Sequence, residues 1–476
     1  MLGLFGTLNL AGQSLQTQMT GVEVTGQNLA NVDTTGYTRQ TVDIQTSPDI
    51  MTPVGPEGTG SEVASIQQAV DTLLNGQIQG QQSVNGYWNA QQSALQSIQD
   101  SLDEFLSSSG STSSSSSSSD STSSSGLSTL INNFFNDFQS VATSPTSIPA
   151  RQALISDAQN LSSAFNQISS QLDQENTSLN SSLSNGVDSA NQLLSGIAAL
   201  NQQISAAVSG GGNANDLFDE RQQDLNNLAQ LTDITTSSGA NDSVNVSIDG
   251  QALVSGNQLV DTLQTYDPGN GNLLVQTATG GVPLTLTGGS LQGTIEARDG
   301  TLATLQGSVN TLASNLIVQV NSIYNTGYSL TGTTGADFFS GSDAGTINVN
   351  PSLANDPSAF QASGSATASG DNTVALELAE LADTPQGNLN QQTFSGSYDE
   401  TVGNFGDALQ AANTQVSNQT AVMNMLTTQQ SSISGVSVDQ EMTNLLGFQQ
   451  AYEASAELVT TVNQMLGDTL AMKSGS

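Results

Sequence analysis

Apolar residues recur near both ends of the chain at steps of three and four positions, which is the spacing of amphipathic helices that pack on other helices. Near the start this seam consists of Leu4, Leu8, Ala11, Leu15, Val22 and Leu29. Near the end a broader apolar face consists of Leu445, Phe448, Tyr452, Val459, Val462 and Leu466. Because neither helix can bury such a face alone, we expect the two ends of the chain to pack on each other.

The same periodicity predicts a series of helices between the two ends. The expected segments are 63–105, a helix from about 127, 151–204 with a register shift between 172 and 179, 217–231, 302–323, 372–383, 405–432 and 439–472. The stretch 36–62 is rich in Gly, Pro, Asn and Asp, and we expect it to be extended or irregular. Ser-rich residues 110–126 contain nothing apolar to bury and predict a flexible loop.

From about residue 235 the period changes to two. Val244, Val246 and Ile248 alternate with polar residues and lead into Asp249-Gly250, which is a strong hairpin signal. Residues 326–370 are again rich in Gly, Ser and Thr. We therefore expect a β-rich outer domain at residues 236–370, including a connecting helix at 300–325, at the far end of the rod.

The fold class predicted from these patterns is mainly α: a long helical coiled-coil rod formed by the N- and C-terminal segments, with an inserted β-rich outer domain. The expected divisions are an N-terminal inner helix (1–35), an extended connection (36–62), two parts of a helical rod domain (63–235 and 371–436) around the outer domain (236–370), and a C-terminal inner helix (437–476).

Composition excludes several classes of function. The 476 residues include no Cys and no His, so the chain has no thiol nucleophile, no imidazole base and no Cys/His zinc site. Five Lys and Arg face 42 Asp and Glu, and the formal net charge of -37 excludes general nucleic-acid binding. We also expect no membrane insertion and no cleaved signal peptide, because no run of 18 apolar residues and no basic N-terminal segment is present.

Candidate catalytic and cofactor sites are weak. The densest charged cluster comprises Asp216, Asp219, Glu220, Arg221 and Asp224. We interpret it as a solvated helix start, capped by Asp216 or Asn215 and paired internally to Arg221, rather than as a glycosidase carboxylate pair. Residues 296–299 are interpreted as acidic capping residues before a helix. No phosphate-binding loop or calcium-binding loop motif is found, so we predict no enzyme activity, no cofactor and no metal site.

The segment ANVDTTGYTRQ at residues 30–40 differs from these clusters. It follows a helix and brings together Asn31, Thr34, Gly36, Tyr37 and Arg39, preceded by Asn28. Gly36 can take a positive φ, the Tyr37 ring can anchor the turn, and Arg39 can pair with an acid of another element or subunit. From the residues alone, a simple helix end explains the segment equally well.

This segment resembles the Asn-x-x-Thr-x-Gly-Tyr-x-Arg signature of the axial proteins of the bacterial flagellum, which are rod, hook and hook-associated proteins. More specific segments are found at 215–234, 244–256, 288–316 and 437–466. In chain order, these resemble the hook-associated protein 1 family. The resemblance implies that the terminal helices form the inner tube of an axial structure, and that the chain is a structural subunit of the hook–filament junction.

The resemblance also implies a set of partners. These are other copies of the chain in a ring, the hook protein and a second junction protein as axial neighbours, an export chaperone on the C-terminal helix, and the flagellar type III export apparatus. It implies an extracellular location in the flagellum, reached without a cleaved signal peptide. The alternatives are another hook or rod protein or, from a different class, a secreted wall-active hydrolase or an adhesin.

Overall fold

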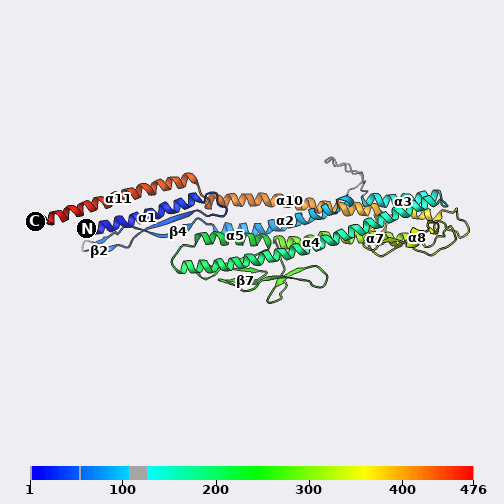
Figure 1. Cartoon of the computed structure of the whole chain (residues 1–476), viewed down its shortest axis with the longest axis horizontal. Helices are drawn as coiled ribbons and strands as arrows, with labels where there is room; N and C mark the ends of the chain where they lie inside the picture. The colour runs from blue at the N-terminus through cyan, green and yellow to red at the C-terminus, as the bar shows by residue number, and fades with distance from the viewer. Residues whose placement is uncertain (1–2, 53–54, 107–125, 475–476) are drawn as a thin grey trace.

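The computed structural model describes residues 3–52, 55–106 and 126–474, and the chain forms a long helical rod (Figure 1). The two ends of the chain lie at the same end of this rod. The Ser-rich loop predicted at 110–126 lies outside the described residues except for Gly126.

Helices dominate the described chain. The α-helices are α1 (Leu4–Ala30), α2 (Thr72–Leu106), α3 (Leu127–Thr143), α4 (Ile148–Ser209), α5 (Asn215–Leu231), α6 (Gly289–Glu296), α7 (Ala303–Tyr324), α8 (Pro351–Asn355), α9 (Thr373–Glu380), α10 (Phe394–Ser434) and α11 (Val438–Ser474). Short 3-10 turns lie at Ala240–Asp242, Pro357–Ala359 and Gly387–Leu389, and a π-helical turn at Ala297–Leu302 joins α6 to α7.

The strands form small antiparallel sheets. They are β1 (Gln40–Thr46), β2 (Ile50–Thr52), β3 (Gly55–Glu57), β4 (Ser61–Gln68), β5 (Thr235–Ser238), β6 (Val244–Ile248), β7 (Gln251–Ser255), β8 (Gln258–Leu259), β9 (Leu263–Tyr266), β10 (Leu274–Thr277), β11 (Phe339–Ser340) and β12 (Asn348–Val349). Their pairings are β1–β4, β2–β3, β5–β6–β7–β8, β9–β10 and β11–β12.

The main core of the rod forms where α3, α4, α7, α9 and α10 pack together. Aromatic rings fill its distal part: Phe338 and Phe339 lie with ring centroids 4.7 Å apart, and both rings also contact Phe134 of α3. Residues 326–370 therefore supply core residues at the end of the rod opposite the chain ends, instead of completing the β-rich domain as expected. Their apolar anchors, widely spaced among Gly and Ser, carry no periodicity that would reveal this role.

The strands β5 to β10 form a β-module along the side of the rod, and not at its far end as predicted (Figure 1). The buried side chains of β6 and β7 pack on the second half of α4, together with α5 and α6. Helix α4 itself has 62 residues and continues through the predicted register shift between 172 and 179. At about 1.5 Å per residue it spans about 90 Å, long enough to join the two cores.

The helix expected at 300–325 belongs to the rod and not to the β-module. Helix α6, the π-helical turn and α7 are continuous from Gly289 to Tyr324. Leu302, Leu305 and Val309 lie in the main core. The helix therefore starts earlier than predicted, at Gly289. Gly289 and Gly293 lie so close to neighbouring backbone atoms that a side chain at either position would clash.

The predicted helix beginning near Val63 is wrong for residues 63–70, because strand β4 occupies that region and α2 begins at Thr72. Val63 and Ile66 pair across the β1–β4 ribbon with Ile44 and Val42, respectively. A register shift after Asp43 breaks the alternation that would have indicated a strand. The stretch predicted as an extended connection is thus largely a two-stranded ribbon alongside α1.

The fold-class prediction is confirmed: the chain is mainly helical, with long helices at both termini and a strand-containing central region. Among the described residues, no helix has an apolar stretch long enough to cross a bilayer.

A pair of carboxylates between α3 and α4 gives the rod a pH-dependent contact. Burial and the neighbouring Asp157 carboxylate raise the pKa of Asp137 to about 6. Between about pH 4 and 6, the folded chain therefore keeps a proton on the Asp137 carboxyl that the unfolded chain has already lost. This contribution to stability is fully present below the unfolded pKa and disappears as the pH rises through about 6.

We expect the Asp137→Asn variant to lack this contribution to the pH dependence. Between pH 4 and 7, the free energy of unfolding of the wild type should fall by about 1 kcal/mol relative to that of the variant, allowing for solvent screening. The measurement is urea unfolding of both proteins across this range, and a constant difference between the two curves would contradict the expectation.

Candidate assembly interface

The first and last long helices, α1 and α11, lie side by side at one end of the rod (Figure 1). The hydroxyl groups of Ser14 and Ser455 lie 2.9 Å apart, joining positions that are 441 residues apart in the chain. The Phe448 ring packs on Gly21, where a Cβ atom would lie 2.6 Å from Phe448 Cδ1. The close approach of the two helices at this level therefore depends on the absence of a side chain at position 21.

The apolar residues predicted to pack between these helices are only partly covered. Those on α1 are half-buried except for Ala11, which is buried; the half-buried ones are Leu4, Leu8, Leu15, Val22 and Leu29. On α11, Val462 is buried, Tyr452 is 41% exposed, and Leu445, Phe448, Val459 and Leu466 are half-buried. The single chain thus leaves much of each apolar face open to a neighbour.

The most deeply buried positions of α1 are mainly small or polar ones, and of these the predicted apolar seam includes only Ala11. They are Ala11, Thr17, Gly21, Val24, Thr25 and Asn28. They are buried because α1 contacts the β1–β4 ribbon as well as α11. The Thr17 hydroxyl, for example, donates to the carbonyl of Ser61 at 3.0 Å. Repeated small residues at helical spacing were the available signal for this close packing.

Asn28 is the centre of the predicted assembly motif and is 1% exposed. Its amide nitrogen donates to the Gln40 carbonyl at 2.8 Å and to Glu441 Oε2 at 3.0 Å. Its amide oxygen accepts from the Tyr37 hydroxyl and from the Gln40 backbone N–H, both at 2.9 Å. We call Asn28, Tyr37, Gln40 and Glu441 the Asn28 hub. It links α1, β1 and α11 through one side chain that uses all four of its hydrogen-bonding positions.

The remaining motif residues shape the turn after α1. Asn31 donates to the Gln27 carbonyl and accepts from the Thr34 hydroxyl. Gly36 has φ +84°, a conformation that favours glycine. Arg39 donates from Nη1 to Gln440 Oε1 at 3.1 Å, so its partner is an amide and not the acid expected from the sequence. The turn thereby brings the start of β1 against the junction of α10 and α11, where the Arg39 N–H donates to the Ser434 carbonyl.

The start of α5 binds the other side of the hub through polar side chains. Asp216 accepts from Gln40 at 3.1 Å, and Asp219 accepts from the Thr38 N–H at 2.9 Å and from Gln68 at 2.8 Å. The predicted capping role is wrong, because Ala214 occupies the N-cap position and no side chain caps the helix. These carboxylates hold the ribbon instead, a contact that a local helix pattern cannot reveal.

The acidic surroundings of the hub affect its tyrosine. Burial, followed by the charges of Asp216, Asp219 and Glu441, raises the pKa of Tyr37 to about 12. Burial also raises the pKa of Asp219, against the effect of the hydrogen bonds it accepts. The Tyr37 hydroxyl therefore stays protonated at physiological pH and can donate to Asn28.

Three arginines point inward and bind carbonyl or amide oxygens. Arg221 donates to Asn201 Oδ1 and to the Asp242 carbonyl, so the predicted pairing within its own helix is wrong. Arg151 is 1% exposed and donates to the carbonyls of Pro145 and Phe360. Each of these guanidinium groups joins separate parts of the rod.

The third inward arginine, Arg298, lies in the π-helical turn between α6 and α7. It pairs with Asp299 at 2.8 Å and donates to Asn180 Oδ1 and the Leu273 carbonyl. Residues 296–299 therefore lie inside a continuous helix and are not the caps predicted from the sequence. Arg298 fastens this helix to α4 and to the start of β10.

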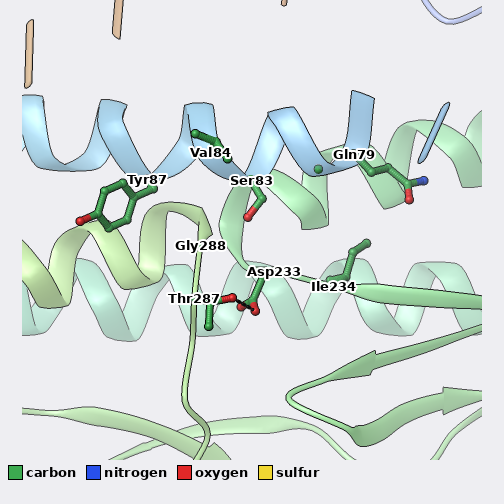
Figure 2. A pocket seen from close by; sticks show the side chains of 9 residues that line it. Gln79, Ser83, Val84, Tyr87, Asp233, Ile234, Thr287 and Gly288 are labelled. Carbon is green, nitrogen blue, oxygen red and sulfur yellow. Dashed lines mark hydrogen bonds between the residues drawn. The ribbon is translucent and has the colours of Figure 1, made fainter. Parts of the chain in front are cut away.

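A cavity of about 320 Å³ lies where the β-module joins the rod (Figure 2). Helix α2 lines one side, and the segments entering and leaving the β-module line the other. Its single carboxylate, Asp233, accepts from the Thr287 hydroxyl at 2.5 Å. Within the described residues, no three acidic side chains are grouped so as to hold a metal ion. The cavity therefore offers no carboxylate pair of the kind that glycoside hydrolysis uses.

Comparisons with known proteins match the two ends and the middle of the chain separately. Residues 8–38 match the family described as flagella basal body rod protein, and residues 428–472 match the C-terminal family of the flagellar basal body rod FlgEFG proteins. Residues 115–339 match the family described as flagellar hook-associated protein FlgK helical domain. The chain therefore contains a FlgK-type helical domain between two segments that match flagellar rod proteins.

Relatives within the hook-associated protein 1 family match over almost their whole length. Flagellar hook-associated protein 1 of Bacillus subtilis is 27% identical, over 98% of this chain and 98% of that protein. Its counterpart in Escherichia coli is 23% identical, over 96% and 97% of the two chains. The structure of the flagellar hook junction protein FlgK from Burkholderia pseudomallei has the same fold, with a TM-score of 0.62 and 19% identity, covering 75% of this chain and all of that one. The two rod-protein matches include most of α1, the motif as far as Thr38, and most of α11.

Proposed function

We propose that this chain is a structural subunit of the bacterial flagellum that forms the junction ring between hook and filament. The observation that carries the proposal is the pairing of α1 with α11, which leaves the apolar faces of both helices only partly covered. Copies arranged around an axis would cover these faces with those of their neighbours. The ring would then adapt the hook to the filament and permit the filament to assemble.

The spacing on α1 supports helix packing between copies. Leu8, Leu15, Val22 and Leu29 follow one another every seven residues and remain half-buried in the single chain. A heptad seam of this kind packs into the corresponding seam of another helix. Because every copy carries the same seam, the contact can repeat around a closed ring.

The proposed neighbours and route follow from this role. The hook protein and a second junction protein are the expected axial neighbours, and the expected location is extracellular, in the flagellum. We infer export through the type III apparatus without a cleaved signal peptide, with a chaperone covering the apolar face of α11 beforehand. Loss of chaperone binding on removal of residues 437–476, in a pull-down with the flagellar chaperones of the source bacterium, would support the last inference.

We infer a mechanical role and no enzyme activity. Two of the carboxylates that the sequence offered for catalysis, Asp216 and Asp219, hold the ribbon through hydrogen bonds. A purified chain that cleaves peptidoglycan would support the wall-active hydrolase instead.

Deleting the gene in the source bacterium tests the proposed role. We expect bare hooks on the cells and flagellin monomers in the medium, observed by electron microscopy and immunoblot. Persistent filaments would overturn the junction assignment, and loss of the hooks would favour a hook or rod protein.

The α1 seam should be required for incorporation but not for folding of the rod. We expect the triple variant Leu8→Ala, Leu15→Ala, Val22→Ala to lose at least about tenfold in incorporation into isolated hooks, because it removes apolar area that a neighbour would cover. The matched control replaces Asn9, Gln16 and Glu23 by Ala, since these exposed positions have the same spacing one residue along. Equal incorporation of the two variants, measured by immunoblot, would contradict the seam assignment.

A further inference from the structure

Positive charge is almost absent from the surface that the proposed ring would use. Of the four arginines, Arg151 and Arg298 are 1% exposed and Arg221 is 9% exposed, and all three bind oxygen atoms inside the rod. Arg39 is half-buried and donates to Gln440. The side chain of the one lysine, Lys473, lies outside the described residues. A neighbouring copy therefore meets hardly any cation on the described surface.

Carboxylates and apolar side chains share the surface of the α1–α11 end. The exposed acids of α1, the following turn, the ribbon and α11 are Glu23, Asp33, Asp43, Asp49, Asp439, Glu453, Glu457 and Asp468. The exposed large apolar residues of α1 and α11 are Phe5, Met19, Val438, Met442, Leu446, Tyr452, Leu458, Met465, Leu470 and Met472. Four of the acids lie on α11, and three of these, Glu453, Glu457 and Asp468, lie near apolar residues at heptad spacing such as Leu458 and Met465. Packing of these apolar residues between copies would bring like charges together.

We propose that the described residues at this end form no stabilising ion pairs between copies in the ring, and that their contacts depend on dissolved cations to screen the carboxylates. The inference rests on the proposed function, since it concerns the contacts between copies in the ring. Contacts held by salt bridges weaken as salt is added, because salt screens attraction. Here salt screens repulsion between carboxylates and strengthens apolar association, so adding salt strengthens the contact. The effect is general screening, with no specific cation site.

The test uses isolated hooks that carry the full-length protein. They are warmed stepwise in about 0.01 M or about 1 M NaCl, where the Debye length is about 30 Å or about 3 Å. After sedimentation, the released protein is measured by immunoblot, with hook protein as the control for intact hooks. We expect release at least about tenfold greater in the dilute salt. Equal release, or greater release in concentrated salt, would overturn the proposal.

Two variants with matched charge changes locate the effect. Glu453→Gln, Glu457→Gln and Asp468→Asn together should abolish most of the dependence on salt. The control, Glu377→Gln, Glu380→Gln and Glu400→Gln, removes as many exposed charges from α9 and the distal part of α10, and should leave the dependence unchanged. Similar curves for the two variants would overturn the assignment to α11.

Two further comparisons separate the explanations. Release in KCl should equal release in NaCl at the same ionic strength. If a few millimolar MgCl2 prevents release as well as concentrated NaCl does, a bound divalent cation is responsible, and general screening is overturned. If the wild-type protein is missing from isolated hooks under all salt conditions, the proposed junction role fails and this inference falls with it. If it is present but insensitive to salt, only this inference fails.

Discussion

Replacing Asn28 by Asp is expected to separate α1 from α11 without unfolding the rod. The substitution removes both donors, to the Gln40 carbonyl and to Glu441, and places a second carboxylate about 3.0 Å from Glu441 Oε2. Asn28 and Glu441 are 1% and 3% exposed, so water cannot relieve the repulsion. We expect the free energy that holds the two helices together to decrease by about 3–5 kcal/mol, as for other buried charges left without a partner.

Amide exchange of the purified chain measures this loss directly. Protection along α1 and α11 should decrease strongly in the Asn28→Asp variant, while α4 and α7 keep theirs. Asn31→Asp is the matched control, because it makes the same change one turn later, where the amide donates to an exposed carbonyl, that of Gln27. Its effect should stay below about 1 kcal/mol. Wild-type protection at both ends of the Asn28→Asp variant would rule out the hub as the link between the helices.

A second change distinguishes repulsion from a simple loss of packing. Combining Asn28→Asp with Glu441→Gln removes one carboxylate and supplies an amide that can donate to the new one. We expect this double variant to regain much of the protection lost in the single variant, since the two side chains can bond again with donor and acceptor exchanged.

Gly86→Ala should strongly destabilise the packing of α2 on α5. A Cβ atom at this position of α2 would lie 2.0 Å from the Gln230 carbonyl oxygen of α5, which is backbone and cannot rotate away. We expect a loss of about 3 kcal/mol, because α2 must move off α5. Gly76→Ala on the same helix meets nothing within 4 Å and should instead stabilise the chain by about 1 kcal/mol. Urea unfolding of both variants is the measurement, and equal shifts would show that the close contact is absent.

Sequence periodicity predicted the helical rod and the pairing of its ends because apolar spacing records which faces must leave water. It did not predict the deep burial of Thr17 or Gly21, since their burial comes from close approach to the ribbon and to the Phe448 ring. The ribbon itself was missed in part because Val63 and Ile66 fit a helical spacing, while the register shift in β1 hid the strand alternation.

The motif residues were found through their resemblance to flagellar axial proteins, whereas their hydrogen bonds required the structure. Nothing local indicates that Glu441 lies beside Asn28, because they are 413 residues apart. The carboxylates of α5 were similarly interpreted as a solvated helix start, with Asp216 as a candidate cap, although Asp216 and Asp219 bind residues more than 150 positions away. Long-range polar pairing of this kind leaves no periodic trace in the sequence.

The meeting of first and last helices also sets an order of events in folding. Helix α11 follows α1 by more than 400 residues, so α1 lacks this helical partner until α11 has been made. Closing a loop of more than 400 residues becomes far less costly once α2, α4 and α10 have folded and brought the ends together, so the α1–α11 contact should form last. A chain that terminates early would keep its apolar first helix uncovered. The completed pair thus distinguishes chains that contain α11 from shorter fragments, and a fragment without α11 could not make the contacts that the proposed ring requires.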